Sequence, residues 1–197
     1  MMKLLTERYR YIREVLYNRR ICKQFGSVGR GTVIARPCML QGGGLKNVHI
    51  GNNTRIQSHS VLESWSKYGD QVFSPSIKIG DNCKFGEYFH LTSCNRITIG
   101  NGLLTGRFVL ITDNSHGCLS MDYSDTPPIS RPLESKGEVV IGNNVWLGDK
   151  VTILAGVQIG DNVIIGANSV VTKDIPSNSM AAGIPARVLK QVKKETL

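Results

Sequence analysis

Aliphatic residues recur at every sixth position through the C-terminal third of the chain. The first set comprises Ile141, Leu147, Ile153, Ile159, Ile165 and Val171. A second set, mostly valine, lies two residues before each of these, at Val139, Val145, Val151, Val157, Val163 and Ser169. A period of six matches neither an α-helix nor a plain alternating strand, but it fits a short strand and a turn, repeated many times.

The two sets share one side of the chain because residues i and i−2 of a strand point to the same face. The Gly-Asn, Gly-Asp and Asp-Asn pairs between them are typical of turns, since these residues tolerate positive φ. Three such strands close a triangular coil of about eighteen residues, and coils stack as parallel strands about 4.8 Å apart. Each coil buries its apolar side only against its neighbours, so the pattern predicts an all-β solenoid, a parallel β-helix.

A weaker form of the same period occurs earlier in the chain. Its three runs are Ile50, Ile56 and Leu62, then Ile79, Phe85 and Leu91, then Ile99, Thr105 and Ile111. Non-repeating segments at about 63–76, 92–97 and 117–138 interrupt the runs. We therefore predict a β-helix over residues 31–180 with a protruding loop at 117–138, and loops of that length in a compact domain are usually functional or disordered.

Both ends of the chain are predicted to be helical. Residues 1–30 include Leu5, Tyr9, Ile12 and Leu16 at helical spacing, which predicts an amphipathic helix that caps the open end of the solenoid. The same segment is basic, so a peripheral contact of residues 1–25 with anionic lipid is compatible with capping. Residues 181–197 are predicted to form a short basic C-terminal helix or tail that begins at Pro185.

Composition narrows the classes of function. The net charge is +9, but residues 1–30 hold eight Lys and Arg against two acids, so the remaining chain is nearly balanced. No nucleic-acid-binding motif accompanies the charge, and no nucleic-acid partner is predicted. The five cysteines are widely spaced and form no CxxC pair, which fits neither a disulfide framework nor a zinc site. With no secretory leader or membrane span evident, a cytoplasmic location is expected.

The stretch IGNNVWLGDKVTILAGVQIGDNVIIGANSVVTKDIP, followed by AAGIPARVLK, closely resembles the hexapeptide-repeat acyltransferases. The segments ITDNSHG at 111–117 and ISRPLES at 129–135 match the bacterial polysaccharide and lipopolysaccharide O-acetyltransferases, with galactoside and maltose acetyltransferases as near cousins. The resemblance covers residues 48–190. It implies a left-handed coil, a homotrimer with active sites between subunits, and acetyl transfer from acetyl-CoA to a sugar hydroxyl of a cell-surface polysaccharide or its precursor, without a metal.

The resemblance places the catalytic histidine at His116, which follows a repeat unit and begins the protruding loop. Acetyl transfer to a hydroxyl needs a base, and an imidazole with an ordinary pKa near 6.5 suits that task. We expect direct transfer, in which His116 first accepts the hydroxyl proton and then protonates the leaving thiolate. Either Asp113 or a backbone carbonyl is expected to orient the ring.

Other positions match the family's binding residues. Contacts with the cofactor are expected at Trp146, Asp149, Ala167, Thr172, Lys173 and Arg187. By the same resemblance, Trp146 is expected to flank the reactive end of the cofactor, Asp149 to act mainly through its backbone, and Lys173 and Arg187 to neutralise phosphate charge. Contacts with the carbohydrate acceptor are expected at Tyr88, His90, Asp113 and Arg131.

Two other functions remain open on the sequence. The chain is alternatively a serine or amino-sugar N-acetyltransferase, or a non-catalytic β-helix that serves binding or assembly. A zinc carbonic anhydrase on the same coils needs three histidine ligands, and only His90 and His116 are suitably placed. No metal site is therefore predicted.

Overall fold

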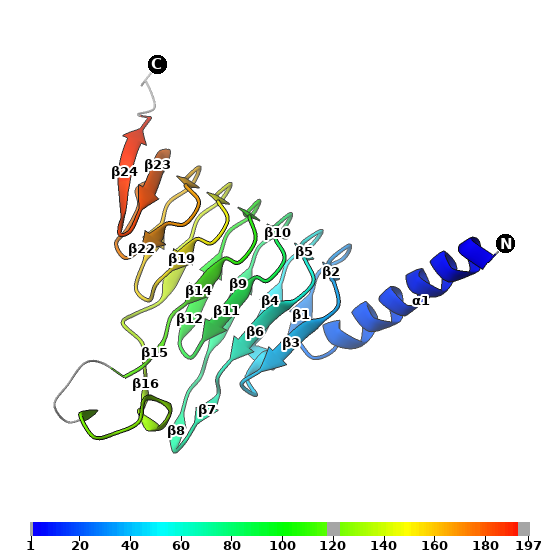
Figure 1. Ribbon diagram of the computed structural model, residues 1–197, viewed down its shortest axis with the longest axis horizontal. Helices are drawn as coiled ribbons and strands as arrows, with labels where there is room; N and C mark the ends of the chain where they lie inside the picture. Colours follow the sequence, from blue (N-terminus) through cyan, green and yellow to red (C-terminus); the bar gives the residue numbers. More distant parts are fainter. Residues whose placement is uncertain (1, 118–122, 193–197) are drawn as a thin grey trace.

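The structure, a computed structural model, describes residues 2–117 and 123–192. Helix α1 (Met2–Cys22) is followed by a left-handed solenoid of short parallel strands, in which the chain passes through three sheets in turn (Figure 1). Sheet A contains β1 (Ser27–Val28), β4 (Val48–Ile50), β9 (Ser76–Ile79), β12 (Arg96–Ile99), β17 (Val139–Ile141) and β20 (Gln158–Ile159). The left-handed β-helix expected from the sequence is confirmed.

The other two sheets complete the triangular coil. Sheet B contains β2 (Val33–Ile34), β5 (Arg55–Ile56), β10 (Lys84–Phe85), β13 (Leu104–Thr105), β18 (Trp146–Leu147), β21 (Ile164–Ile165), β23 (Ser179–Gly183) and β24 (Ala186–Gln191). Sheet C contains β3 (Cys38–Gln41), β6 (Ser60–Ser64), β11 (His90–Ser93), β14 (Leu110–Thr112), β19 (Thr152–Ile153) and β22 (Val170–Val171). A single 3-10 turn, η1 (Leu45–Asn47), precedes β4.

The six-residue period forms the core, as predicted. All six residues of the periodic set from Ile141 to Val171 are at most 2% exposed, and so is each residue two places before them. The register stacks these positions directly, for example Thr105 on Leu147 and Leu147 on Ile165. Because parallel pairing repeats the same side at every coil, one continuous aliphatic column fills the interior.

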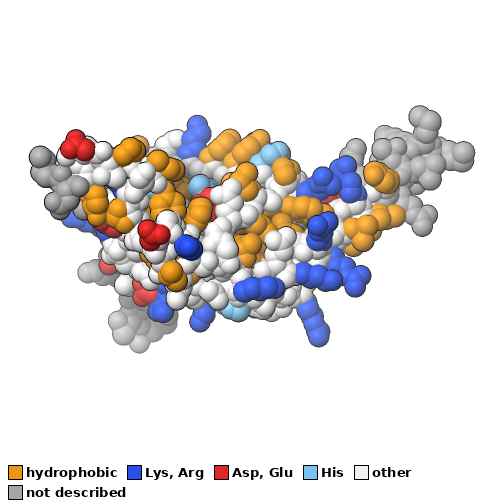
Figure 2. Space-filling model, turned by 90° about the horizontal axis from the view of Figure 1, so that it is seen from below, with side chains coloured by type: hydrophobic (Ala, Val, Ile, Leu, Met, Phe, Trp, Pro, Cys, Tyr) orange, Lys and Arg blue, Asp and Glu red, His pale blue; other side chains and the backbone are white. Residues whose placement is uncertain are grey.

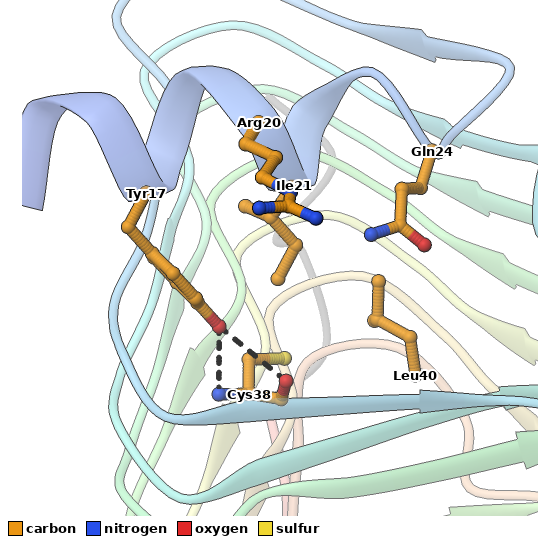
Figure 3. Close-up of a pocket in the computed structure, with 6 residues that line it drawn as sticks. All are labelled: Tyr17, Arg20, Ile21, Gln24, Cys38 and Leu40. Carbon is orange, nitrogen blue, oxygen red and sulfur yellow. Dashed lines mark hydrogen bonds between the residues drawn. The ribbon is translucent and has the colours of Figure 1, made fainter.

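The end of α1 closes the N-terminal opening of the solenoid. Ile21 is buried in the core, and the Tyr17 hydroxyl accepts a hydrogen bond from the Cys38 N–H at 2.9 Å. Figure 3 shows the resulting pocket of about 380 Å³ between the helix and β3, with Arg20 and Gln24 on its helical side. The contact of Tyr17 with β3 holds the edge strand of sheet C, which has a neighbouring strand on one side only.

The apolar stripe predicted to do the capping does not do so. Tyr9, Ile12 and Leu16 are 68%, 46% and 60% exposed, because the first turns of α1 extend away from the solenoid (Figure 1). The side chain of Leu5 lies outside the described residues. Across residues 2–117 and 123–192, no helix has both the length and the apolar character needed to span a bilayer. The capping face is therefore a different side of the helix from the one that the spacing indicated.

The predicted short C-terminal helix is wrong for the described residues. Ala186–Gln191 forms β24, which pairs antiparallel with β23 after a reversal at Gly183, where φ is 108°. β23 continues the parallel stack on β21, so the hairpin covers the last coil on sheet B. Strand pairing satisfies backbone groups at that edge, which a detached helix leaves open.

Two insertions leave the solenoid at the same end of the sheet C strands (Figure 1). The first, the β7–β8 hairpin, contains β7 (Lys67–Tyr68) and β8 (Gln71–Val72) and follows β6. The second is the predicted loop, in which β15 (Ser115–His116) pairs antiparallel with β16 (Leu133–Glu134), preceded by the 3-10 turn η3 (Pro128–Ser130). The rest of the fold is a rigid support for these two segments.

Candidate functional site

His116 lies on β15, immediately after the strand β14 of sheet C. It faces Leu133 across the β15–β16 ladder, and its side chain is exposed. Gly117 follows with φ of 70°, and a Cβ at that position would lie 3.3 Å from the Cβ of Arg131. The glycine thus permits the turn that directs the imidazole toward a cavity of about 340 Å³.

The wall of this cavity, here called the acceptor cavity after the role predicted for His90, is polar on one side and aromatic on the other. Glu63 and His90 come from sheet C, and Trp65 and Tyr68 come from the hairpin insertion. His90 Nε2 lies 3.3 Å from Glu63 Oε2, and its hydrogen bond holds the pKa of Glu63 below the ordinary value. A concave site with a few polar groups beside aromatic rings suits a small polar ligand.

A second cavity of about 320 Å³ lies across the Asn114–Ser115 segment from the first. It is lined by Lys136, Leu154 and Thr172, while Asn114 and Ser115 line both cavities. Thr172, predicted to contact the cofactor, therefore lies beside the segment that carries His116. His116 itself lines only the first cavity, and the residues just before it, Asn114 and Ser115, are shared by both.

The other predicted cofactor residues do not lie beside His116 in the single chain. Trp146 is 50% exposed on the outer face of sheet B, stacked between Leu104 and Ile164. Ala167 lies at the corner between sheets B and C, and Lys173 follows β22. Arg187 is exposed on β24 and donates to the Ala186 carbonyl at 2.9 Å. These residues therefore lie on different faces of the triangular solenoid.

Asp149 has its carboxylate turned along the solenoid. Its Oδ1 accepts a hydrogen bond from the Arg107 N–H at 2.7 Å, and a Cβ on Gly106 would overlap that oxygen at 2.1 Å. Its own carbonyl accepts the Asn168 N–H at 2.8 Å. The carboxylate thus bonds the preceding coil, and a contact of Asp149 with a cofactor mainly through its backbone stays a prediction.

Asp113 is placed where it performs neither of its predicted tasks. The side chain is fully buried and accepts four hydrogen bonds, from the Ser93 hydroxyl at 2.5 Å, the Cys94 N–H at 2.9 Å, the Asn95 N–H at 3.1 Å and Asn114 Nδ2 at 3.2 Å. With its oxygens occupied in this way, the carboxylate is unavailable to an acceptor or to the His116 ring. It is a structural group beneath the site.

Of the remaining acceptor predictions, His90 alone lines the acceptor cavity. Tyr88 is stacked between His59 and Phe108 at the corner between sheets B and C, with ring centroids 4.8 Å and 4.6 Å away. Arg131 lines a neighbouring cleft between the two insertions, and its Nε donates to the Thr126 carbonyl at 2.9 Å. The structure therefore separates Tyr88 from His116 and keeps Arg131 near it.

Sequence reasoning missed Glu63, Trp65, Tyr68 and Gln71. All lie in or beside the segment 63–76, which breaks the six-residue period. Two aromatic residues close together there, in a chain with only 7% aromatics, were the signal that the break has a purpose. This signal indicated that the segment is functional, but it did not indicate which other part of the chain the segment contacts.

Among the described residues, no cluster of metal-ligating side chains is found, and the cysteine thiols have raised pKa values. Within residues 2–117 and 123–192, no group of three His, Cys, Asp or Glu is arranged to hold a metal ion. Burial raises the pKa of the Cys38 thiol to about 12 and that of Cys94 to about 11, so both are poor nucleophiles. Cys118, next to Gly117 in the sequence, lies outside the described residues.

Comparison with known proteins gives these features a family. Residues 138–173 match the bacterial transferase hexapeptide family (six repeats). WbbJ of Escherichia coli (strain K12), assigned to lipopolysaccharide biosynthesis as an O-acetyl transferase, is 35% identical over 100% of this chain and 97% of its own length.

Solved structures agree with that match. A galactoside acetyltransferase in complex with coenzyme A is 28% identical with a TM-score of 0.57, over 88% of this chain and 68% of that one. AntD, an N-acyltransferase from Bacillus cereus in complex with dTDP and 3-hydroxybutyryl-CoA, shares the fold at 21% identity and a TM-score of 0.68, over 86% and 85% of the two chains. Because WbbJ matches along the whole of both chains and the repeat matches the family itself, this chain is an enzyme of the hexapeptide-repeat acyltransferase family.

Proposed function

We propose that the protein is an acetyl-CoA-dependent O-acetyltransferase that modifies a sugar hydroxyl of a cell-surface polysaccharide or its precursor. The observation that carries the proposal is the position of His116 at a strand that separates two cavities. One cavity has the polar and aromatic wall that a sugar needs, and the other is lined by Thr172. The whole-length match to WbbJ and the coenzyme A in the galactoside acetyltransferase structure support the same reading.

In the proposed reaction, His116 acts as the general base. Its imidazole accepts the proton of the acceptor hydroxyl while that oxygen attacks the carbonyl carbon of the thioester. The tetrahedral intermediate then collapses with cleavage of the C–S bond, and the imidazolium returns its proton to the departing thiolate. A sugar hydroxyl is hardly ionised at neutral pH, so this base contributes on the order of 10²–10⁴ to the rate.

The cofactor site is proposed to need more than one subunit. Trp146 lies on sheet B, whereas His116 and Thr172 lie at the ends of sheet C strands, so one chain presents them on different faces. A homotrimer with acetyl-CoA in the grooves between subunits brings Trp146 and Ala167 of one copy to His116 of the next. Lys173 and Arg187 are then the cations for the phosphates.

The proposal is tested by thiol release from acetyl-CoA with a panel of acceptors. The panel contains neutral hexosides, N-acetylhexosamine glycosides, uronic acids and the free amine of glucosamine. We expect a neutral or N-acetylated sugar to stimulate release and to gain an ester that mild alkali removes. Release with glucosamine alone, giving an alkali-stable amide, would replace O-transfer with the N-acetyltransferase alternative.

The exposed half of α1 is proposed to bind the anionic lipids of the inner face of the cytoplasmic membrane. Figure 2 shows Lys and Arg side chains gathered at the N-terminal end, with hydrophobic side chains between them. Tyr9, Tyr11, Ile12, Val15 and Leu16 are all exposed there. A helix with apolar and basic surface binds the lipid interface by burying the former and by attraction of the latter to anionic headgroups.

We expect the protein to sediment with vesicles that contain phosphatidylglycerol and not with pure phosphatidylcholine vesicles. Replacement of both Ile12 and Leu16 by serine should lower the bound fraction at least tenfold, and salt should weaken the remaining binding. Val72→Ala, at a distant exposed position, is the matched control. If the double variant changes the oligomeric state and leaves vesicle binding intact, the surface is an interface between copies of the chain.

A further inference from the structure

The two insertions of the solenoid are bonded to each other, although they lie about sixty residues apart in the sequence. The Tyr68 hydroxyl donates to the Ile129 carbonyl at 2.5 Å. The Leu133 N–H donates to Gln71 Oε1 at 2.7 Å, and Gln71 Nε2 donates to the Leu133 carbonyl at 3.2 Å. The Gln71 amide thus pairs with both backbone polar groups of Leu133, as a neighbouring strand would.

Leu133 is the residue that pairs with His116 in the β15–β16 ladder, and it is 4% exposed. Any shift of β16 therefore changes the position of the strand that carries the histidine. Gln71 binds β16 at that residue and at no other backbone position that the structure records. The amide fixes the register of β16 from outside the loop.

Tyr68 also touches the histidine itself. The centroids of the Tyr68 and His116 rings are 5.3 Å apart at an interplanar angle of 63°, an edge-to-face contact. The Trp65 ring in turn contacts Tyr68 edge to face, with centroids 5.9 Å apart at 89°. The Asp113 carboxylate, which the sequence offered as the orienting group, is fully engaged elsewhere. Tyr68 therefore contacts the imidazole of His116, whereas Asp113 does not.

The hairpin is itself anchored to the solenoid, so it can act as a support. The Ser66 N–H donates to the Gly42 carbonyl at 2.8 Å, and the Phe73 N–H donates to the Ser66 carbonyl at 2.9 Å. Trp65 Nε1 donates to Thr92 Oγ1 at 3.2 Å on sheet C. The bonds to Gly42 and Thr92 tie the base of the hairpin to the solenoid, and the bond between Phe73 and Ser66 closes that base.

We propose that the β7–β8 hairpin positions the general base, with Gln71 holding β16 against β15 and Tyr68 setting the orientation of the His116 ring. The inference rests on the proposed role of His116. Tyr68 and Gln71 are positioning residues, since they act through His116. Misplacement of a reacting group by about 1 Å costs as much as 10² in rate. The cavity lined by Thr172 lies across Asn114–Ser115 from the hairpin, so binding of acetyl-CoA depends little on it.

The test combines a spectroscopic signal with kinetics, using four variants of the full-length protein. Tyr68→Ala removes the ring and the hydroxyl, Tyr68→Phe keeps the ring, Gln71→Ala removes the amide, and Val72→Ala is the control on the same hairpin, where the side chain is 80% exposed. The chain has only four histidines, so labelling with ¹³Cε1-histidine gives four signals, and His116→Ala identifies the relevant one.

We expect Tyr68→Ala and Gln71→Ala to move the His116 signal while His49, His59 and His90 keep theirs. With the fastest acceptor of the panel, kcat should fall roughly 10–100-fold in both, with KM for acetyl-CoA within about twofold. Tyr68→Phe should restore most of the kcat lost in Tyr68→Ala, because the ring contact remains. Val72→Ala should match the wild type in signal and rate.

Two results would overturn the proposal and leave the acyltransferase function intact. One is an unmoved His116 signal in both Tyr68→Ala and Gln71→Ala. The other is a displaced signal with an unchanged kcat, which would show contact without positioning. Failure of the wild type to release thiol with every acceptor would instead overturn the proposed function, and the histidine signals would still decide whether the hairpin holds His116.

Discussion

Replacement of His116 by alanine is expected to lower acceptor-dependent thiol release by about 10²–10⁴, the usual contribution of a general base. The side chain is exposed at the mouth of the acceptor cavity and contributes nothing to the core, so the variant should fold and melt as the wild type does. The measurement is the initial rate of thiol release at saturating acetyl-CoA, together with the melting temperature.

His90→Ala is the matched control, because His90 lines the same cavity and lies beside Glu63. Its loss should act mainly on KM for the sugar. A His116→Ala enzyme with nearly full activity would remove the base from this position and would leave His90 as the remaining imidazole of the cavity.

The same variant tests whether neighbouring subunits share the site. When His116→Ala and Trp146→Ala chains are expressed together, mixed trimers contain some grooves in which both residues are intact. Random assembly of a cyclic trimer gives about a quarter of such grooves, so activity should return to about that fraction of the wild-type value. If mixing restores nothing, the two residues do not meet across a subunit boundary.

Replacement of Asp113 by alanine is expected to reduce the free energy of unfolding by about 3–5 kcal/mol, because the buried Cys94 N–H, the partly buried Asn95 N–H and the buried Ser93 hydroxyl lose their acceptor. The Asp113 side chain is fully buried in the folded protein. For a chain of this size such a loss lowers the melting temperature by roughly 10 °C. Thermal unfolding followed by circular dichroism measures the shift.

Asp161 offers a matched control for this effect. Its Oδ1 also accepts a backbone hydrogen bond, from the Asn143 N–H at 2.5 Å, but at an exposed corner of the solenoid. Water can satisfy that N–H in Asp161→Ala, so the cost should stay within about 1 kcal/mol. Equal melting temperatures for the two variants, with turnover lost only in Asp113→Ala, would return Asp113 to the role of a group that orients His116.

The sequence was sufficient for the solenoid because the same constraint repeats at every coil. Each match, such as Leu147 between Thr105 and Ile165, adds to one periodic signal. Because the coils stack in register, the residues at this period are the residues of the core. Even Thr105, the poorest match, is 5% exposed, and its hydroxyl accepts the Gly86 N–H at 2.9 Å.

The parts that sequence missed are those in which two non-repeating segments meet. Neither Gln71 nor Leu133 belongs to a periodic run, and no local rule links them. The predictions for the two ends of the chain were wrong for a related reason. The stripe of Tyr9, Ile12 and Leu16 indicates a helix but not the face that contacts the solenoid, and the basic tail after Gly183 carries no mark of the free edge that it pairs with. In each case the deciding partner is distant in the chain.

The regular rise from coil to coil sets the distance between the two insertions that form the candidate site. Leu62, Leu91 and Ile111 lie on three successive strands of sheet C, so the starting points of the hairpin and of the loop that carries His116 are two strands apart, or about 10 Å at the spacing of parallel strands. That separation is set by the count of coils and is independent of the loops. Insertion of whole coils after β22 would lengthen the molecule and preserve the site, whereas removal of the single coil between the two starting points would bring Gln71 one strand too close to Leu133.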